Sequence, residues 1–153
     1  MLFPQPELEN LATVTVDLAP PLDFGPGPDG HHRTVPITGG TVDGPALAGR
    51  VRSGGADWQR VLPDGTVFVE ARYTLELSSS LVGLTSTGVR TGPPAVLAAL
   101  ARGEDVDPAG YYFRLALRAT AADPRFRWLT TSVLLGRAER TAGQVRYDLY
   151  RLL

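Results

Sequence analysis

Hydrophobic and polar residues alternate along most of this chain, at the two-residue period of a β-strand with one buried face. The clearest run is residues 66–77 (TVFVEARYTLEL), where every odd-numbered position is apolar and most even-numbered positions are polar. Weaker runs of the same kind predict further strands along the chain. They are expected near Leu11–Leu18, Val35–Thr41, Ala46–Arg52, Trp58–Leu62, Leu81–Arg90, Tyr111–Thr120, Trp128–Arg140 and Val145–Leu152.

Breaks in this pattern predict the turns and one helix. Pro63-Asp64-Gly65 is typical of a turn, so Trp58–Leu62 is expected to form a hairpin with the strand that follows it. The segment Pro20–Gly30 (PPLDFGPGPDG) predicts one long loop, because closely spaced Pro and Gly disfavour a strand ladder. A helix is expected at Ala95–Arg102 (AVLAALAR), which follows two prolines and precedes a glycine.

Many strands with one short helix predict an all-β fold, as a single domain over residues 1–153. We expect a closed antiparallel, calycin-like β-barrel of about 8–9 strands, because long strands suit a tilted closed sheet. A β-sandwich is the alternative. The face of residues 66–77 that carries Glu70 and Arg72 is expected to line a polar lumen, and the opposite assignment, with the apolar face inward, is also compatible with the pattern.

Composition removes several kinds of chemistry. All 15 basic residues are Arg, and Cys is absent, which excludes Lys and thiol nucleophiles, disulfides and thiolate metal sites. The two histidines, His31 and His32, are adjacent and would point to opposite faces of a strand, so no metal is expected. A phosphate-binding loop and a nucleophile elbow are also missing from the sequence, so we expect no cofactor.

Charge and hydropathy narrow the expected partners. The net charge is -1 and the basic residues are scattered, so neither nucleic acid nor an anionic membrane is an expected partner. The start of the chain, Met1–Pro6, lacks the basic and apolar regions of a signal peptide, and no run is apolar enough to span a membrane. A cytoplasmic location is therefore the expectation, and a homodimer is possible in principle.

An ordered set of short motifs over nearly the whole chain resembles a bacterial family, domain of unknown function 3237. The motifs are Val35-Pro36-Ile37-Thr38-Gly39-Gly40, Gly54-Gly55-Ala56-Asp57-Trp58-Gln59, Ala71-Arg72-Tyr73, Gly88 with Arg90 and Gly92-Pro93-Pro94, Tyr111-Tyr112-Phe113-Arg114, and Trp128-Leu129. The resemblance implies a small one-domain β-barrel and little about activity.

Three strands depart from the residues typical of that family. Thr85-Ser86-Thr87 replaces an Arg-Asn-Arg run, Ala119-Thr120 replaces a Phe-Glu pair, and Thr130 replaces an Asn. One interpretation is neutral drift on a solvent-exposed face. The interpretation we favour is a lumen that has been hollowed and made less charged, to hold a bulkier and more apolar ligand.

The candidate catalytic residues are Glu70, Arg72 and Tyr73. Glu70 and Arg72 share a strand face and would form the polar centre of a lumen, although a structural ion pair is the simpler explanation for them. The Tyr73 hydroxyl would polarise a carbonyl, but Tyr73 lies on the other face, so a bulge would be needed to bring all three together. The candidate ligand-binding residues are Trp58, Tyr112, Trp128, Thr85, Thr87 and Arg118. The alternative for the aromatic residues is core packing, and for Asp57 a turn role is expected.

These features together predict a barrel that binds a small apolar organic molecule in its lumen. The expected activity is that of a cofactor-independent cyclase or isomerase acting on a polyketide-like biosynthetic intermediate, because such reactions depend on shape, desolvation and a few hydrogen-bond donors. The alternatives are a non-catalytic carrier of the same kind of ligand and a structural interaction module with a filled interior.

Overall fold

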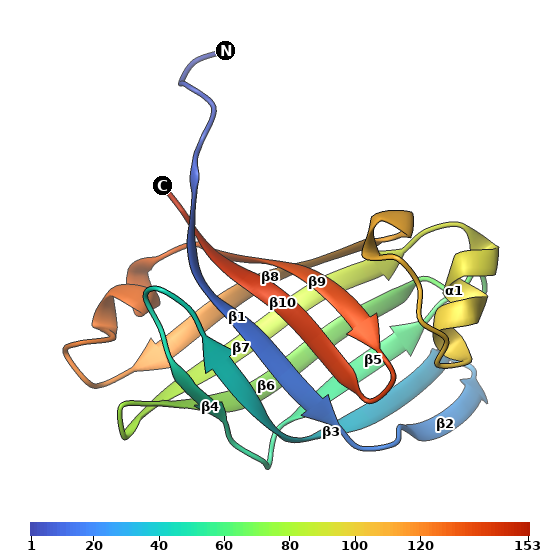
Figure 1. Ribbon diagram of the computed structural model, residues 1–153. Helices are drawn as coiled ribbons and strands as arrows, with labels where there is room; N and C mark the ends of the chain where they lie inside the picture. Colours follow the sequence, from blue (N-terminus) through green and yellow to red (C-terminus); the bar gives the residue numbers. More distant parts are fainter.

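Ten strands pair in one antiparallel sheet that curves round and closes (Figure 1). The computed structural model describes Met1–Leu153. The strands are β1 (Leu8–Leu18), β2 (Leu22–Gly27), β3 (Gly30–Asp43), β4 (Gly49–Val51), β5 (Ala56–Val61), β6 (Val67–Leu77), β7 (Ser80–Thr91), β8 (Tyr112–Ala121), β9 (Leu134–Thr141) and β10 (Gln144–Leu152). The helices are α1 (Pro94–Ala101) and two 3₁₀ helices, η1 (Pro108–Gly110) and η2 (Arg127–Thr131).

The barrel is closed by β1, which pairs with β10 on one side and with β3 on the other. From β1 the ring continues through β10, β9, β8, β7 and β6. The short strands β4 and β5 together occupy the position between β6 and β3, since each of them pairs with both of these strands. β2 lies outside this ring and pairs with β3. The predicted closed antiparallel barrel is thus confirmed, and the sandwich alternative is wrong.

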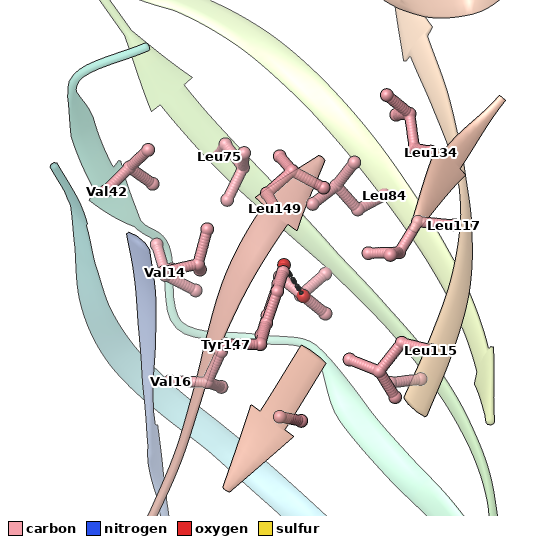
Figure 2. Close-up of a cluster of buried hydrophobic side chains, with 14 of the residues drawn as sticks. Val14, Val16, Val42, Leu75, Leu84, Leu115, Leu117, Leu134, Tyr147 and Leu149 are labelled. Carbon is pink, nitrogen blue, oxygen red and sulfur yellow. Dashed lines mark hydrogen bonds between the residues drawn. The ribbon is translucent and has the colours of Figure 1, made fainter. Parts of the chain in front are cut away.

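The apolar face of each long strand points into the barrel. In β6, Val69 and Tyr73 are buried, whereas Glu70 and Arg72 are exposed on the outer face. Inward side chains from different strands, including Leu149, meet in the interior in Figure 2. The expectation that Glu70 and Arg72 line a polar lumen is therefore wrong, because burying the wholly apolar odd face removes more apolar surface from water.

The two ends of the barrel are filled differently. Next to the β6–β7 turn, Leu75, Leu77 and Val82 are almost completely buried, so this end is a packed apolar plug. At the other end α1 lies across the opening, with Leu97 against Gly65 in the β5–β6 turn and Leu100 also buried. No helix in the structure is long and apolar enough to cross a membrane. Inward polar side chains gather in the half of the barrel near α1.

Two segments differ from the sequence expectation. Most of the predicted loop Pro20–Gly30 forms β2, because an edge strand tolerates Pro and the ladder skips a register step around Gly25, whose φ is 75°. The predicted strand Trp128–Arg140 begins instead as η2 and becomes extended only from Leu134. The Trp128 indole N–H donates to the carbonyl of Arg125, which holds this tight turn.

Candidate functional site

The inward face of β5 is polar where the other strands are apolar. Asp57 and Gln59 point into the barrel and are 8% and 3% exposed, while Trp58 between them faces outward. Register pairs Gln59 with Arg33 on β3, and Arg33 Nη2 donates to Gln59 Oε1 at 2.7 Å. Gln59 Nε2 in turn donates to Asp57 Oδ2 at 2.7 Å. A hydrogen-bonded chain thus runs from Arg33 through Gln59 to the Asp57 carboxylate.

Two more arginines extend into the same region from other strands. Arg90 on β7 is only 5% exposed, and its guanidinium lies over the Phe113 ring, 5.6 Å from the centroid. Arg140 on β9 is partly buried and donates from Nε to the carbonyl of Thr141 at 2.9 Å. We call Arg33, Asp57, Gln59, Arg90 and Arg140 the lumen polar cluster. Its members come from four strands spread along the sequence.

Three atoms of this cluster are buried without a hydrogen-bond partner. They are Asp57 Oδ1, Arg90 Nη1 and Arg33 Nε. They are also the only buried side-chain nitrogen or oxygen atoms of the molecule without one. Because an unsatisfied buried polar atom costs about 1–3 kcal/mol, such atoms usually bind a water molecule, an ion, a ligand or a reacting group.

Burial perturbs the ionisation of the cluster. Desolvation raises the pKa of Asp57, and the attraction of Arg90 and Arg140 together with the hydrogen bond from Gln59 offsets only part of this effect. Desolvation and repulsion from Arg140 and Arg33 lower the pKa of Arg90 to about 10. Desolvation likewise lowers the pKa of Arg140. Strongly perturbed groups enclosed together are typical of functional sites.

A pair of buried tyrosines lies next to this cluster. The hydroxyls of Tyr73 on β6 and Tyr147 on β10 are 2.5 Å apart and form a hydrogen bond across the lumen (Figure 2, dashed line). Burial raises the pKa of both phenols, so both hydroxyls stay protonated at neutral pH. Because one hydroxyl donates to the other, the second retains an O–H with no partner in the structure, which is free to donate to a ligand.

Removing either hydroxyl of this pair leaves its partner unsatisfied. We expect Tyr73→Phe and Tyr147→Phe each to lower the free energy of unfolding by about 1–3 kcal/mol. The double variant should lose clearly less free energy of unfolding than the two single variants added together, because it leaves no unpaired hydroxyl. Urea denaturation of the three variants measures this, with Tyr112→Phe on the exposed face of β8 as a control near zero. Additive losses would show that the two hydroxyls are not coupled.

A small cavity joins the Asp57 carboxylate to the tyrosine pair. It has a volume of about 40 Å³, and its lining includes Asp57, Tyr73, Tyr147 and Ser86 within an otherwise mostly apolar wall. This is room for water or for a few ligand atoms, not for a polycyclic molecule. Two of the lining residues are only partly buried, Leu18 at the end of β1 and Val145 at the start of β10. The wall of the cavity is therefore least covered at the ends of β1 and β10.

Most residues predicted as the site lie together, but on the outside of the barrel. Register places Glu70 between Trp58 and Thr87, and Arg72 next to Thr85. Thr85 in turn pairs with Arg118 on β8. All of these side chains are exposed, and Trp58 is 48% exposed. Of the predicted catalytic residues, the structure thus brings only Tyr73 into the lumen.

Most positions where the chain departs from the motifs of domain of unknown function 3237 line a groove on this outer face. The groove has a volume of about 950 Å³ and runs along β7 and β8 beside η2. Its lining includes Thr85, Thr87, Arg118, Thr120 and Thr130. For Thr85, Thr87 and Thr120 the interpretation that small side chains hollow the lumen is wrong, because these residues of β7 and β8 point outward and widen an external groove instead. Ser86 and Ala119 do face the interior: Ser86 is buried and lines the small cavity, and Ala119 packs against the core.

The remaining candidates lie away from the lumen. Tyr112 is exposed on β8, where the Arg114 guanidinium stacks over its ring. Trp128 belongs to η2, and Arg151 of β10 covers its ring. His31 bonds to Asp23, and His32 lies near Asp29, so both histidines stay within the β2–β3 hairpin.

The sequence does not reveal the lumen polar cluster. For Asp57 it predicts a turn role, Gln59 and Arg90 enter only as parts of the family motifs, and Arg33 and Arg140 carry no prediction. A signal was present at β5, since ADWQRV places two polar residues on one face and Trp on the other, the reverse of an ordinary half-buried strand. The arginines carried no comparable local signal.

The raised pKa of Asp57 predicts how stability depends on pH. An acid with a raised pKa in the folded state stabilises the fold most when it is protonated, and this contribution is lost as pH rises through that pKa. Asp57→Asn mimics the protonated acid, so we expect it to melt at a higher temperature than wild type at pH 7. The difference should shrink on acidification toward the ordinary Asp range. Thermal melts at several pH values test this, with the exposed substitution Asp43→Asn as the control. A difference in melting temperature between Asp57→Asn and wild type that does not change with pH would contradict the prediction.

Comparisons with known proteins agree with the fold and with the resemblance of the motifs. A family model described as "Protein of unknown function (DUF3237)" matches residues 6–152. UPF0311 protein RPA1785 of Rhodopseudomonas palustris is 34% identical over 99% of this chain and 100% of its own length. Its crystal structure, described as a conserved protein of unknown function, superimposes with a TM-score of 0.93 at 33% identity, covering 99% of this chain and 100% of that one.

Two further crystal structures share the barrel. A beta-barrel like protein from Acinetobacter baumannii AYE is 41% identical, with a TM-score of 0.87 over 99% of this chain and 98% of its own. A more distant protein from Penicillium herquei, described as an enzyme, is 18% identical, with a TM-score of 0.71 over 100% of this chain and 99% of its own. At that identity the likeness shows the fold alone. The match over nearly the whole length, together with relatives above 30% identity, means that this chain belongs to the DUF3237 family.

Proposed function

We propose that this protein binds a small organic molecule in its lumen and transfers protons on it without a cofactor, as an isomerase or cyclase. The observation that carries this proposal is the buried Asp57 carboxylate, whose Oδ1 has no partner and whose other oxygen is held by Gln59. Such a carboxylate is positioned and desolvated, it keeps one oxygen unpartnered, and its residue lines the cavity. Those are the properties that a general base requires.

Each group of the site has a defined role in the proposed reaction. The Asp57 carboxylate removes a proton from a carbon next to a ligand carbonyl, and its raised pKa makes it a stronger base than an exposed Asp. The free O–H of the Tyr73–Tyr147 pair donates to the carbonyl oxygen and stabilises the enolate. In an isomerisation, Asp57 then returns the proton to another atom of the ligand. In a cyclisation, the enolate carbon forms a bond to an electrophilic carbonyl carbon of the same molecule, and Asp57 gives its proton to the alkoxide that results.

The size of the cavity restricts the ligand. A compact enolisable ketone, or one reactive end of a longer polyketide-like chain, is compatible with about 40 Å³ and with a wall that is least covered at Leu18 and Val145. The outer groove is larger, about 950 Å³, but its lining includes one charged side chain, Arg118, and no unpartnered buried polar atom. We therefore place the chemistry in the lumen. The description of the Penicillium herquei protein as an enzyme is in keeping with catalysis on this fold.

Proton exchange at carbon tests this proposal without knowledge of the natural substrate. Incubating the protein in D₂O with two enolisable ketones, levulinate and its neutral isostere 5-methyl-2-hexanone, lets NMR follow deuterium entering beside the carbonyl. The proposal predicts exchange faster than buffer for at least one ketone, and loss of that acceleration in Asp57→Asn. Binding of either ketone without exchange would indicate the alternative, a non-catalytic carrier. Neither binding nor exchange would favour an interaction module.

A further inference from the structure

The lumen polar cluster has an excess of positive charge. It contains three guanidinium groups, from Arg33, Arg90 and Arg140, and a single carboxylate, from Asp57. Asp57 is the one carboxylate whose charge acts on Arg90 and Arg140. Arg90 is 5% exposed, whereas Arg33 and Arg140 are only partly buried, so solvent compensates the charge of Arg90 least, and burying that charge without a nearby anion is unfavourable. The cluster is therefore one or two negative charges short of balance.

The unused hydrogen-bonding atoms show where an anion would bind. Arg90 Nη1 and Arg33 Nε are buried donors with no acceptor, and Arg90 as a whole is 5% exposed. The Phe113 ring supports one face of the Arg90 guanidinium, which fixes its plane. A guanidinium presented in this way has the planar donor geometry that pairs with a planar carboxylate.

The surroundings favour a carboxylate over a phosphate. The cavity beside Asp57 is reached from Arg90 across the Phe113 ring, which lines it, and its wall is mainly apolar, with residues such as Val69 and Leu115 that suit a hydrocarbon body. Asp57 on the same side would repel a second negative charge on a phosphate, whereas a monoanion leaves the cluster closer to neutral. A short organic acid would satisfy the free arginine donors with its carboxylate and fill the apolar part of the cavity with its hydrocarbon body.

We infer that the natural ligand of the lumen is a small monocarboxylate whose carboxyl group is held by Arg90 and Arg33, with its apolar body in the cavity beside Asp57 and the tyrosine pair. This inference rests on the proposed function, because it names the substrate class of that same site. The carboxylate anchors the ligand, and Asp57 acts on the carbon chain that extends toward Tyr73 and Tyr147.

Calorimetric titration with butyrate tests the inference directly. Butyrate should bind, whereas its neutral analogue butyramide and inorganic phosphate should bind at least tenfold more weakly. Arg90→Met should weaken butyrate binding by tenfold or more. Arg60→Met is the matched control, because Arg60 stacks over Phe68 in the same way but on the outer face, and it should bind butyrate like wild type.

The fold of the variants is checked by circular dichroism and thermal melts. Removing an unpaired buried charge should not unfold the barrel; should Arg90→Met fail to fold, Arg90→Lys, which keeps the charge but loses the planar fork, should still weaken butyrate binding. Equal binding of butyrate and butyramide, binding of phosphate as tight as butyrate, or no effect of the Arg90 variants would overturn the inference.

The outcome is separable from that of the proposed function. Asp57-dependent deuterium exchange on 5-methyl-2-hexanone without butyrate binding would overturn the carboxylate inference and leave proton transfer intact. Butyrate binding that requires Arg90, with no exchange on either ketone, would support the anion site and remove the catalytic proposal.

Discussion

Gly40→Ala is expected to lower the free energy of unfolding by at least about 3 kcal/mol. Gly40 lies where β3 pairs with both of its neighbours, opposite Val16 of β1 and Val51 of β4. A Cβ at this position would lie 1.9 Å from the carbonyl oxygen of Thr15, which is backbone and cannot move aside. Its φ of +145° is also one that Ala rarely adopts. The change would therefore force β1 and β3 apart at the point where the barrel closes.

Gly83→Ala is the matched control for this prediction. Gly83 is also a strand glycine, on β7, but a Cβ there would meet Thr120 at an ordinary 3.7 Å and at a φ that other residues accept. Its stability should stay within about 1 kcal/mol of wild type. Urea denaturation of both variants gives the comparison, and equal, small effects would mean that close approach at Gly40 is not what holds β1 against β3.

The alternation of β6 illustrates what the sequence could and could not predict. It correctly grouped Val69 with Tyr73 and Glu70 with Arg72, because the period of a strand depends only on local geometry. Which group faces inward is decided by the whole barrel, since each strand must bury its more apolar face against the others. The expected polar lumen depended on the face of β6 that carries Glu70 and Arg72, whereas the hydrophobic pattern of the remaining strands argues against it.

The lumen polar cluster required information that no local pattern contains. β5 shows an inverted pattern, and from this alone the inward direction of Asp57 and Gln59 was within reach. Arg33, Arg90 and Arg140 are far apart in sequence, and each resembles the exposed arginines of the same chain. Only the register of β3, β7 and β9 around the closed barrel brings them to the same region. The outer groove has the same origin, because it depends on η2 lying beside β8.

Asp57→Asn is expected to reduce lumen-catalysed proton exchange by about 100-fold or more, within the range that a general base contributes. Asn keeps the size of Asp57 and still offers an oxygen to Gln59 Nε2, so the hydrogen-bonded chain from Arg33 can persist. What it loses is the ability to accept a proton from carbon. The effect should appear in the turnover number more than in the affinity, because the ligand contacts of the tyrosine pair are unchanged. Asp43→Asn, an exposed substitution of the same chemistry on β3, should exchange like wild type.

The measurement that tests the lumen as the site of chemistry most directly compares Asp57→Asn with Glu70→Gln. Both remove one carboxylate, the first inside the barrel and the second on its outer face beside Trp58. Deuterium incorporation into levulinate and 5-methyl-2-hexanone is followed by NMR for wild type and for both variants. We predict that the acceleration is lost in Asp57→Asn and retained in Glu70→Gln. Loss in Glu70→Gln with full activity in Asp57→Asn would contradict the account and move the chemistry to the outer face of the sheet.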